Sequence, residues 1–225
     1  MAEARYRGGG LLPTTRLEAF SDGVFAIAIT LLVLELKVPL DSGRLLHELG
    51  AEFPSYLGYF VSFAFIGGVW MAHSNLTRFT KATDQVMMGL NLVLLLFVSL
   101  LPFTTSLMAN HLGDTGQHVA VVVFGVNLTL ASLMVNVMFG YAGRTEGVAD
   151  DEAADAEIRA FGRQRRVVVV LQAVATLFGL LVPLIAVVFY LALSLLMLAD
   201  PIVRAMRRRR TYRSAATSGS VGEER

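Results

Sequence analysis

The amino-acid sequence predicts an all-α integral membrane protein with six transmembrane helices per subunit. Three observations lead to this fold class. Hydrophobic residues make up 55% of the 225 positions and charged residues only 16%, and the mean hydropathy is +0.60. The apolar residues come in long, nearly uncharged runs, whereas a soluble domain would interrupt them with polar helix faces. Lysine and arginine gather in alternate segments between these runs.

The apolar runs match the length that a membrane requires. A hydrocarbon core of roughly 30 Å needs about 20 apolar helical residues, and helices are expected because a backbone in lipid must satisfy its own hydrogen bonds. Along the chain, the runs cover residues 20–38, 54–72, 86–108, 119–141 and 167–199. The last run is too long for one span and contains Gly179 and Pro183, so we expect a tight turn there; one long kinked helix is the alternative.

The basic residues predict the orientation. All 19 except Lys37 and Arg44 fall in the N-terminal segment, the loops after the second and fourth spans, or the C-terminal tail. Because cytoplasmic loops carry an excess of lysine and arginine, both termini are expected in the cytoplasm, with an even number of spans. Cysteine is absent, so neither disulfides nor thiolate metal sites are expected.

The chain divides into one membrane domain and two short flanks. We expect a mobile cytoplasmic N-terminus at 1–13, the six-helix membrane domain at 14–203, and a basic cytoplasmic tail at 204–225. Because the arginine run at 207–210 directly follows a span, it indicates contact with anionic membrane lipids and not with nucleic acid. The acidic segment 145–160 predicts a short cytoplasmic helix with a solvated face.

A polar string opens the first apolar run. Arg16, Phe20, Ser21, Asp22 and Gly23 form the pattern R-x-x-x-F-S-D-G. Ionisable residues within membrane spans are costly, so they are candidates for functional sites. Ser21 and Asp22 could cap the start of the helix, where N–H groups and the helix dipole favour them. Alternatively the helix begins before Arg16, and Asp22 is buried with a polar partner.

A second polar set lies in the second run at the same predicted depth. Trp70, His73 and Ser74 are spaced i, i+3, i+4 and therefore share one helix face, and Asn91 is polar within the third run. Such groups can join neighbouring helices in a membrane. We expect an interhelical network; the alternative is that Trp70 and His73 are interfacial anchors.

The motif and its surroundings resemble a known family. The string RLEAFSDGVFAIAIT followed by LLVLELKVP resembles the first helix of the bacterial branch of the transmembrane protein 175 potassium-channel family. WMAHSN in the second run and LNLVLLLFVSLLPFTT in the third are also similar to it. The resemblance implies a homotetrameric, potassium-selective channel of the bacterial cell membrane. It implies a central pore lined by the first helix of each subunit, with K⁺ as the permeating ion, no cofactor and no other metal.

The resemblance also implies roles for individual residues. The pore constriction would be formed by Ile27, Leu31 and Leu34, and Thr30 would favour potassium. The anchoring network would consist of Arg16, Phe20, Ser21 and Asp22, packed with Trp70 and His73. Ser74 departs from the family, whose members often carry a second histidine at this position, so details of the network are expected to differ.

Periodicity alone does not select the pore face. Ile27, Thr30, Leu31 and Leu34 fall on one stripe of a helix, but this helix is apolar almost all round. The stripe containing Phe25 competes equally well. Rings of isoleucine and leucine can close a narrow pore by dewetting, and acidic rings enrich cations at a pore mouth. Glu35 is therefore a candidate for the pore mouth, or alternatively a partner of Lys37.

Three other classes of function fit the sequence less well. In a proton-coupled secondary transporter, the main rival, Asp22 and His73 would relay protons. An intramembrane enzyme would need Ser21, Asp22 and His73 to converge. A serine directly before an aspartate on one helix cannot easily hold the geometry of nucleophile and base, so no enzymatic activity is expected. The ionisable residues in the spans argue against a purely structural scaffold.

Overall fold

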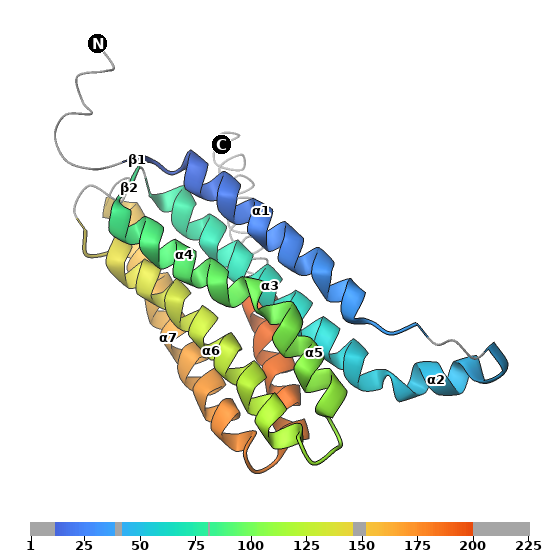
Figure 1. Ribbon diagram of the computed structural model, residues 1–225. Helices are drawn as coiled ribbons and strands as arrows, with labels where there is room; N and C mark the ends of the chain where they lie inside the picture. The colour runs from blue at the N-terminus through green and yellow to red at the C-terminus, as the bar shows by residue number, and fades with distance from the viewer. Residues whose placement is uncertain (1–11, 39–41, 81, 146–151, 200–225) are drawn as a thin grey trace, which may run out of the picture.

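The computed structural model describes residues 12–38, 42–80, 82–145 and 152–199 (Figure 1). Most of these residues are helical. The elements are β1 (Leu12–Pro13), α1 (Thr15–Leu32), the 3-10 turns η2 (Val33–Glu35) and η3 (Ser42–Arg44), α2 (Leu45–Ala51), α3 (Phe53–Phe79), β2 (Ala82–Thr83), α4 (Gln85–Ser99), α5 (Leu101–His111), α6 (Gln117–Ala142) and α7 (Glu152–Phe178). A further apolar helix, Pro183–Ala199, follows α7.

Four helical segments are long and apolar enough to cross a membrane. They are Thr15–Glu35, Phe53–Phe79, Gln85–His111 and Gln117–Ala142. The third combines α4 and α5, which are separated at Leu100, two residues before Pro102. A proline ring disfavours the helical backbone behind it, which explains the break. The first four predicted runs are thus helices in a mostly helical, multi-pass membrane fold.

The fifth run contains the predicted turn. Helix α7 ends at Phe178, the chain turns through Gly179, and the next helix begins at Pro183. The proline stands at the first position of the new helix, where its missing N–H has no partner to lose. The hydroxyl of Tyr190 donates to Thr176 Oγ1 over 3.1 Å, which joins the two helices. The chain therefore forms a hairpin here and not one long kinked helix.

Several boundaries differ from the predicted ones. The apolar run begins at residue 20, but helix α1 already begins at Thr15, so the polar residues before the run belong to the same helix. Leu12 and Pro13 pair antiparallel with Thr83 and Ala82, within the segment that was expected to be mobile. The acidic segment is not a separate short helix, since α7 begins at Glu152 and continues to Phe178. Residues 1–11 and the basic tail, with its arginines at 207–210, lie outside the described residues.

Packing places α1 at one side of the bundle and α7 at the other (Figure 1). Helix α1 packs on α3 and α4, whereas α6 packs on α4, α5 and α7. The core between them is filled by fully buried side chains such as Phe65, Leu94, Phe124 and Tyr190. This arrangement leaves α1 covered on one face only.

Candidate functional site

Helix α1 has two distinct faces. Leu17, Ser21, Phe25, Ala28 and Leu32 are buried, and their spacing of three or four residues places them on one side of the helix. Three large apolar side chains on the other side are exposed: Ile27 by 60%, Leu31 by 42% and Leu34 by 74%. The structure therefore separates the two stripes that periodicity could not. The stripe of Phe25 faces the subunit's own core, and the stripe of Ile27 faces outward.

Thr30 is exposed on the outward face of α1, and a hydrogen bond to the helix backbone orients its hydroxyl group. Its Oγ1 donates to the carbonyl oxygen of Ile27 over 2.9 Å. The hydroxyl proton is thus engaged with the helix backbone, and the oxygen lone pairs remain available on the exposed side. A group held in this way accepts from water or coordinates a cation.

Lys37, just beyond the C-terminal end of the first membrane-spanning segment, has a polar partner on α5. Glu35 closes η2 and is half-buried, while Lys37 is exposed and donates from Nζ to Asn110 Oδ1 over 2.6 Å. The structure shows no hydrogen bond or ion pair between the described residues Glu35 and Lys37, which is the alternative pairing. Glu35 directly follows Leu34, at the end of the helical segment that carries the outward stripe.

A buried network joins α1, α4 and α3. Asn91 Nδ2 donates to Ser21 Oγ over 2.9 Å, and His73 Nε2 lies 2.9 Å from Asn91 Oδ1. Ser21 in turn donates to the carbonyl oxygen of Leu17 over 2.7 Å. None of the three side chains is more than 2% exposed. Ser21 and His73, two of the residues expected to form an interhelical network, are thus joined through Asn91.

Asp22 has a partner but is not buried. The indole Nε1 of Trp70 donates to Asp22 Oδ1 over 2.9 Å, and both side chains are exposed in the single chain. Because α1 begins at Thr15, Asp22 lies in its second turn, so neither it nor Ser21 caps the helix. The expectation of a buried aspartate also fails, since Asp22 lies on the flank of α1 and not on its inner face.

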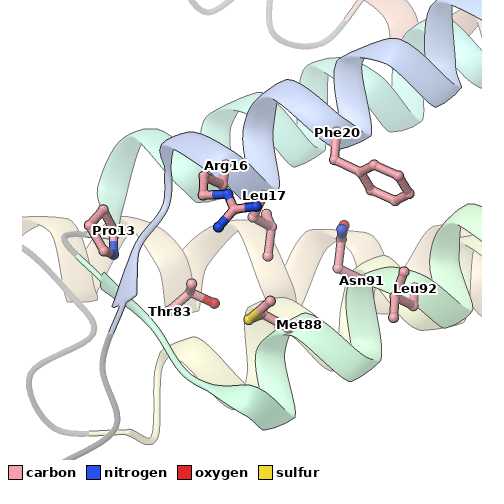
Figure 2. A pocket seen from close by; sticks show the side chains of 8 residues that line it. All are labelled: Pro13, Arg16, Leu17, Phe20, Thr83, Met88, Asn91 and Leu92. Carbon is pink, nitrogen blue, oxygen red and sulfur yellow. The ribbon is translucent and has the colours of Figure 1, made fainter.

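Arg16 and Phe20 lie apart from Trp70 and His73. Together with Met88 and Leu92 of α4, they line a groove of about 390 Å³ between α1 and α4 (Figure 2). Phe20 is 56% exposed, and Arg16 is exposed without a hydrogen bond or ion pair to any described residue. Only Ser21 and Asp22 of the motif therefore contact the second polar set.

A polar pocket of about 300 Å³ lies on the other flank of α1. It is lined by Glu18, Asp22, His73, Ser74, Thr77 and Arg78. Sequence reasoning missed Glu18 and Thr77, although each stands four residues from a residue that it did single out. Within the described residues, no group of three or more His, Asp or Glu side chains could hold a metal ion.

Comparisons with known proteins agree with this architecture. The family model described as "Endosomal/lysosomal potassium channel TMEM175" matches residues 16–102, which run from α1 into α5. A potassium channel of Streptomyces collinus is 41% identical over 138 residues, covering 60% of this chain and 67% of that protein. A potassium channel of Chamaesiphon minutus is 38% identical over 158 residues, covering 68% and 77% respectively.

A solved structure shares the fold. The crystal structure of a lysosomal potassium-selective channel TMEM175 homolog from Chamaesiphon minutus matches with a TM-score of 0.74 and 32% sequence identity. The match covers 82% of this chain and 95% of that chain. The two proteins thus share one helical arrangement over most of this chain and nearly all of that one.

Proposed function

Because the chain belongs to the TMEM175 family of ion channels, which are not enzymes, we propose that it forms a potassium-selective pore lined by α1. The observation that carries the proposal is the exposed apolar stripe of α1. Ile27, Leu31 and Leu34 stand on one face of a membrane-spanning helix, and each is more than 40% exposed in the single subunit. A rotationally symmetric arrangement of identical subunits would gather these faces around one axis.

In the proposed channel, four subunits surround the pore, a number taken from the family resemblance. Rings of Ile27, Leu31 and Leu34 form an apolar constriction that closes when water leaves it. Conduction requires the ring to widen until it is hydrated. Glu35, the residue after Leu34, is proposed to raise the cation concentration at the mouth.

Thr30 is proposed to favour potassium. Potassium holds its hydration shell less tightly than sodium, so a pore that removes part of this shell favours potassium. The outward lone pairs of the Thr30 hydroxyl, oriented by the bond to Ile27, replace some of the lost water. The Ser21–Asn91–His73 network holds α1 in the register that presents this face.

The proposed topology has six crossings and both termini in the cytoplasm of a bacterial cell. The hairpin of α7 and Pro183–Ala199 supplies the last two crossings, although both of its apolar arms are shorter than the first four spans. Arg16 at the start of α1 and Arg78 at the end of α3 stand at one end of the bundle, and Lys37 and Arg44 follow the far end of α1. This distribution is typical of a cytoplasmic side at the arginine-rich end.

Arg16 and Phe20 are proposed to contact the neighbouring subunit. Both are exposed, and on an ideal helix both project on the side of Ile27 and Leu34. Their role as anchors would then be between subunits, across the groove that they line with α4. Ser21 and Asp22 would anchor α1 within its own subunit.

The test is ion flux through the purified protein in liposomes under opposed potassium and sodium gradients, with no added solute. We expect non-saturating potassium flux that sets the membrane potential. The second candidate, a proton-coupled transporter, has one observation in its favour: Asp22 and His73 line the same polar pocket. Flux that appears only with a proton gradient would favour the transporter, and an absence of flux would contradict the channel.

A further inference from the structure

A basic pocket lies where α6 ends beside α7. Its volume is about 650 Å³, and four arginines line it: Arg144, Arg159, Arg163 and Arg166. The three on α7 are spaced i, i+4, i+7 and therefore share one face of the helix, while Arg144 reaches the pocket from just beyond the end of α6. The described residues that line the pocket include no aspartate or glutamate.

The walls of this pocket are fixed by packing between the two helices. Asn136 Nδ2 on α6 donates to the carbonyl oxygen of Gly162 on α7 over 2.8 Å. The rings of Phe139 and Phe161 stack nearby with their centroids 6.1 Å apart. Most of the cavity wall is therefore a feature of the packed helix pair, and Gly143, Arg144 and Thr145 complete it just beyond the end of α6.

Arg165 shows that the arginines of α7 make two kinds of contact. It points away from the pocket, with Nη2 3.4 Å from the carbonyl oxygen of Gly68 and its guanidinium 5.9 Å from the centre of the Phe139 ring. This side chain joins α7 to α3. Arg163 and Arg166, by contrast, are exposed and stand at the pocket. Like charges on one helix face repel one another, and a bound anion removes this repulsion.

The surroundings indicate what kind of anion fits. Directly beyond Arg166, the apolar side chains of Val167 and Val170 are 59% and 60% exposed on α7. Val137, on the pocket wall, is also exposed. The basic pocket thus borders exposed apolar side chains of α7, the helix that lies on the side of the bundle away from α1 (Figure 1). In a bilayer, this boundary is where lipid headgroups meet acyl chains.

We propose that the α6–α7 pocket binds the phosphate headgroup of an anionic phospholipid, with Arg144, Arg163 and Arg166 as its principal cationic ligands. Arginine suits this ligand because its planar fork of donors matches phosphate oxygens. The acyl chains would lie along Val167 and Val170. The assignment of the lipid to the cytoplasmic leaflet rests on the proposed topology; the binding itself does not rest on ion selectivity.

The experiment is native mass spectrometry of the purified full-length protein in detergent, titrated with phosphatidylglycerol or phosphatidylcholine. We expect tighter binding of phosphatidylglycerol. An arginine near an anionic lipid contributes to the binding free energy, and the loss of one arginine is expected to weaken binding about five-fold. The double variant Arg163→Gln, Arg166→Gln should therefore lose affinity for phosphatidylglycerol by about 25-fold. The variant Arg78→Gln, Arg44→Gln makes the same change in net charge outside the pocket and should bind like the wild type.

Three outcomes would overturn the proposal. They are equal phosphatidylglycerol affinity in the pocket variant and the wild type, equal affinity of the wild type for the two lipids, and full displacement of phosphatidylglycerol by millimolar inorganic phosphate. The last would indicate a soluble anion instead of a lipid. The variant Arg163→Lys, Arg166→Lys keeps the charge and should retain most of the binding, which guards against a folding defect. Since no ion flux is measured, a protein that conducts no potassium could still bind the lipid.

Discussion

Asn91 Oδ1 on α4 lies 2.9 Å from His73 Nε2 on α3, and both side chains are almost inaccessible to solvent. The same amide donates to Ser21 on α1. One side chain therefore supplies both a donor and an acceptor to the two helices that flank it. The buried polar atoms Ser21 Oγ and His73 Nε2 therefore each have a hydrogen-bond partner inside an otherwise apolar bundle.

Replacement of Asn91 by leucine is expected to destabilise the subunit by about 1–3 kcal/mol, because His73 loses its Nε2 partner inside the core. Thermal unfolding of the purified protein in detergent measures the effect. Asn110→Leu is the matched control, since Asn110 is exposed and bonds Lys37 at the surface. Equal melting temperatures for the two variants would contradict a stabilising network.

Ile27→Asn is expected to increase potassium leak and to weaken selectivity, because an amide hydrates the apolar constriction. Flux in liposomes under a potassium gradient measures the leak. Leu177→Asn is the control, since Leu177 is a similarly exposed apolar residue of α7, the helix on the far side of the bundle from α1 (Figure 1). If both variants leak alike, or neither does, the pore face has been assigned wrongly.

Thr30→Val removes the hydroxyl and keeps the shape of the side chain. The ratio of potassium to sodium permeability should fall, since the oriented oxygen beside Ile27 is lost. Thr30→Ser retains the oxygen and should preserve most of the ratio. Reversal potentials under mixed gradients give both values; an unchanged ratio in the valine variant would exclude Thr30 from selectivity.

Gly125→Ala is expected to destabilise the bundle by about 1–3 kcal/mol, as overpacking does. A Cβ at Gly125 would stand 2.6 Å from Thr176 Oγ1, and it would overlap the hydroxyl of Tyr190. Gly89→Ala is the control: nothing lies within 4 Å of its Cβ, so alanine should raise helix stability slightly. Melting temperatures that move in the same direction for both variants would refute the close packing at Gly125.

The ionisation of Asp84 is expected to make the free energy of unfolding depend on pH. Partial burial acts to raise its pKa, but hydrogen bonds from the Met87 amide, at 2.8 Å, and the Tyr141 hydroxyl outweigh it, so the pKa is lowered from its ordinary value. A carboxyl whose pKa is lower in the folded state stabilises the fold above its unfolded pKa of about 4. This contribution is lost as the pH falls through the folded pKa.

The melting temperature of the wild type should therefore fall in acid below about pH 4, and Asp84→Asn should flatten this fall. Melting curves collected between neutral pH and acid, for both proteins in the same detergent, test the expectation. Parallel curves would show that the carboxylate of Asp84 does not contribute.

The sequence predicted the features that depend on hydropathy and local backbone chemistry. The apolar runs became helices, and Gly179 and Pro183 marked the hairpin. The network of Ser21, Asn91 and His73 could also be anticipated, because polar side chains at one depth in lipid seek one another. Hydropathy, backbone chemistry and polar pairing act within one helix or between any two neighbouring helices, so they can be recognised without knowing the full packing.

Features that depend on which neighbour a helix face meets could not be predicted. Helix α1 is apolar all round, so its pattern did not distinguish Phe25, in the core, from Ile27, on the outside. Arg16 and Phe20 share a motif with Ser21 and Asp22. Because of the helical twist, however, the first pair lines the groove beside α4, whereas the second pair bonds residues of α3 and α4. The two-residue pairing of β1 with β2 is too short to leave a signal in the sequence.

The two-faced burial of α1 has a consequence for how such proteins diverge. Phe25 and Ile27 are separated by only two positions, but one is tied to the folding of its subunit and the other is not. Substitutions on the outward face can accumulate while the subunit keeps its fold, because they disturb no packing inside it. In the proposed channel, related chains could thus acquire different permeation properties on an inherited fold, with a few side chains of one helix as the variable part.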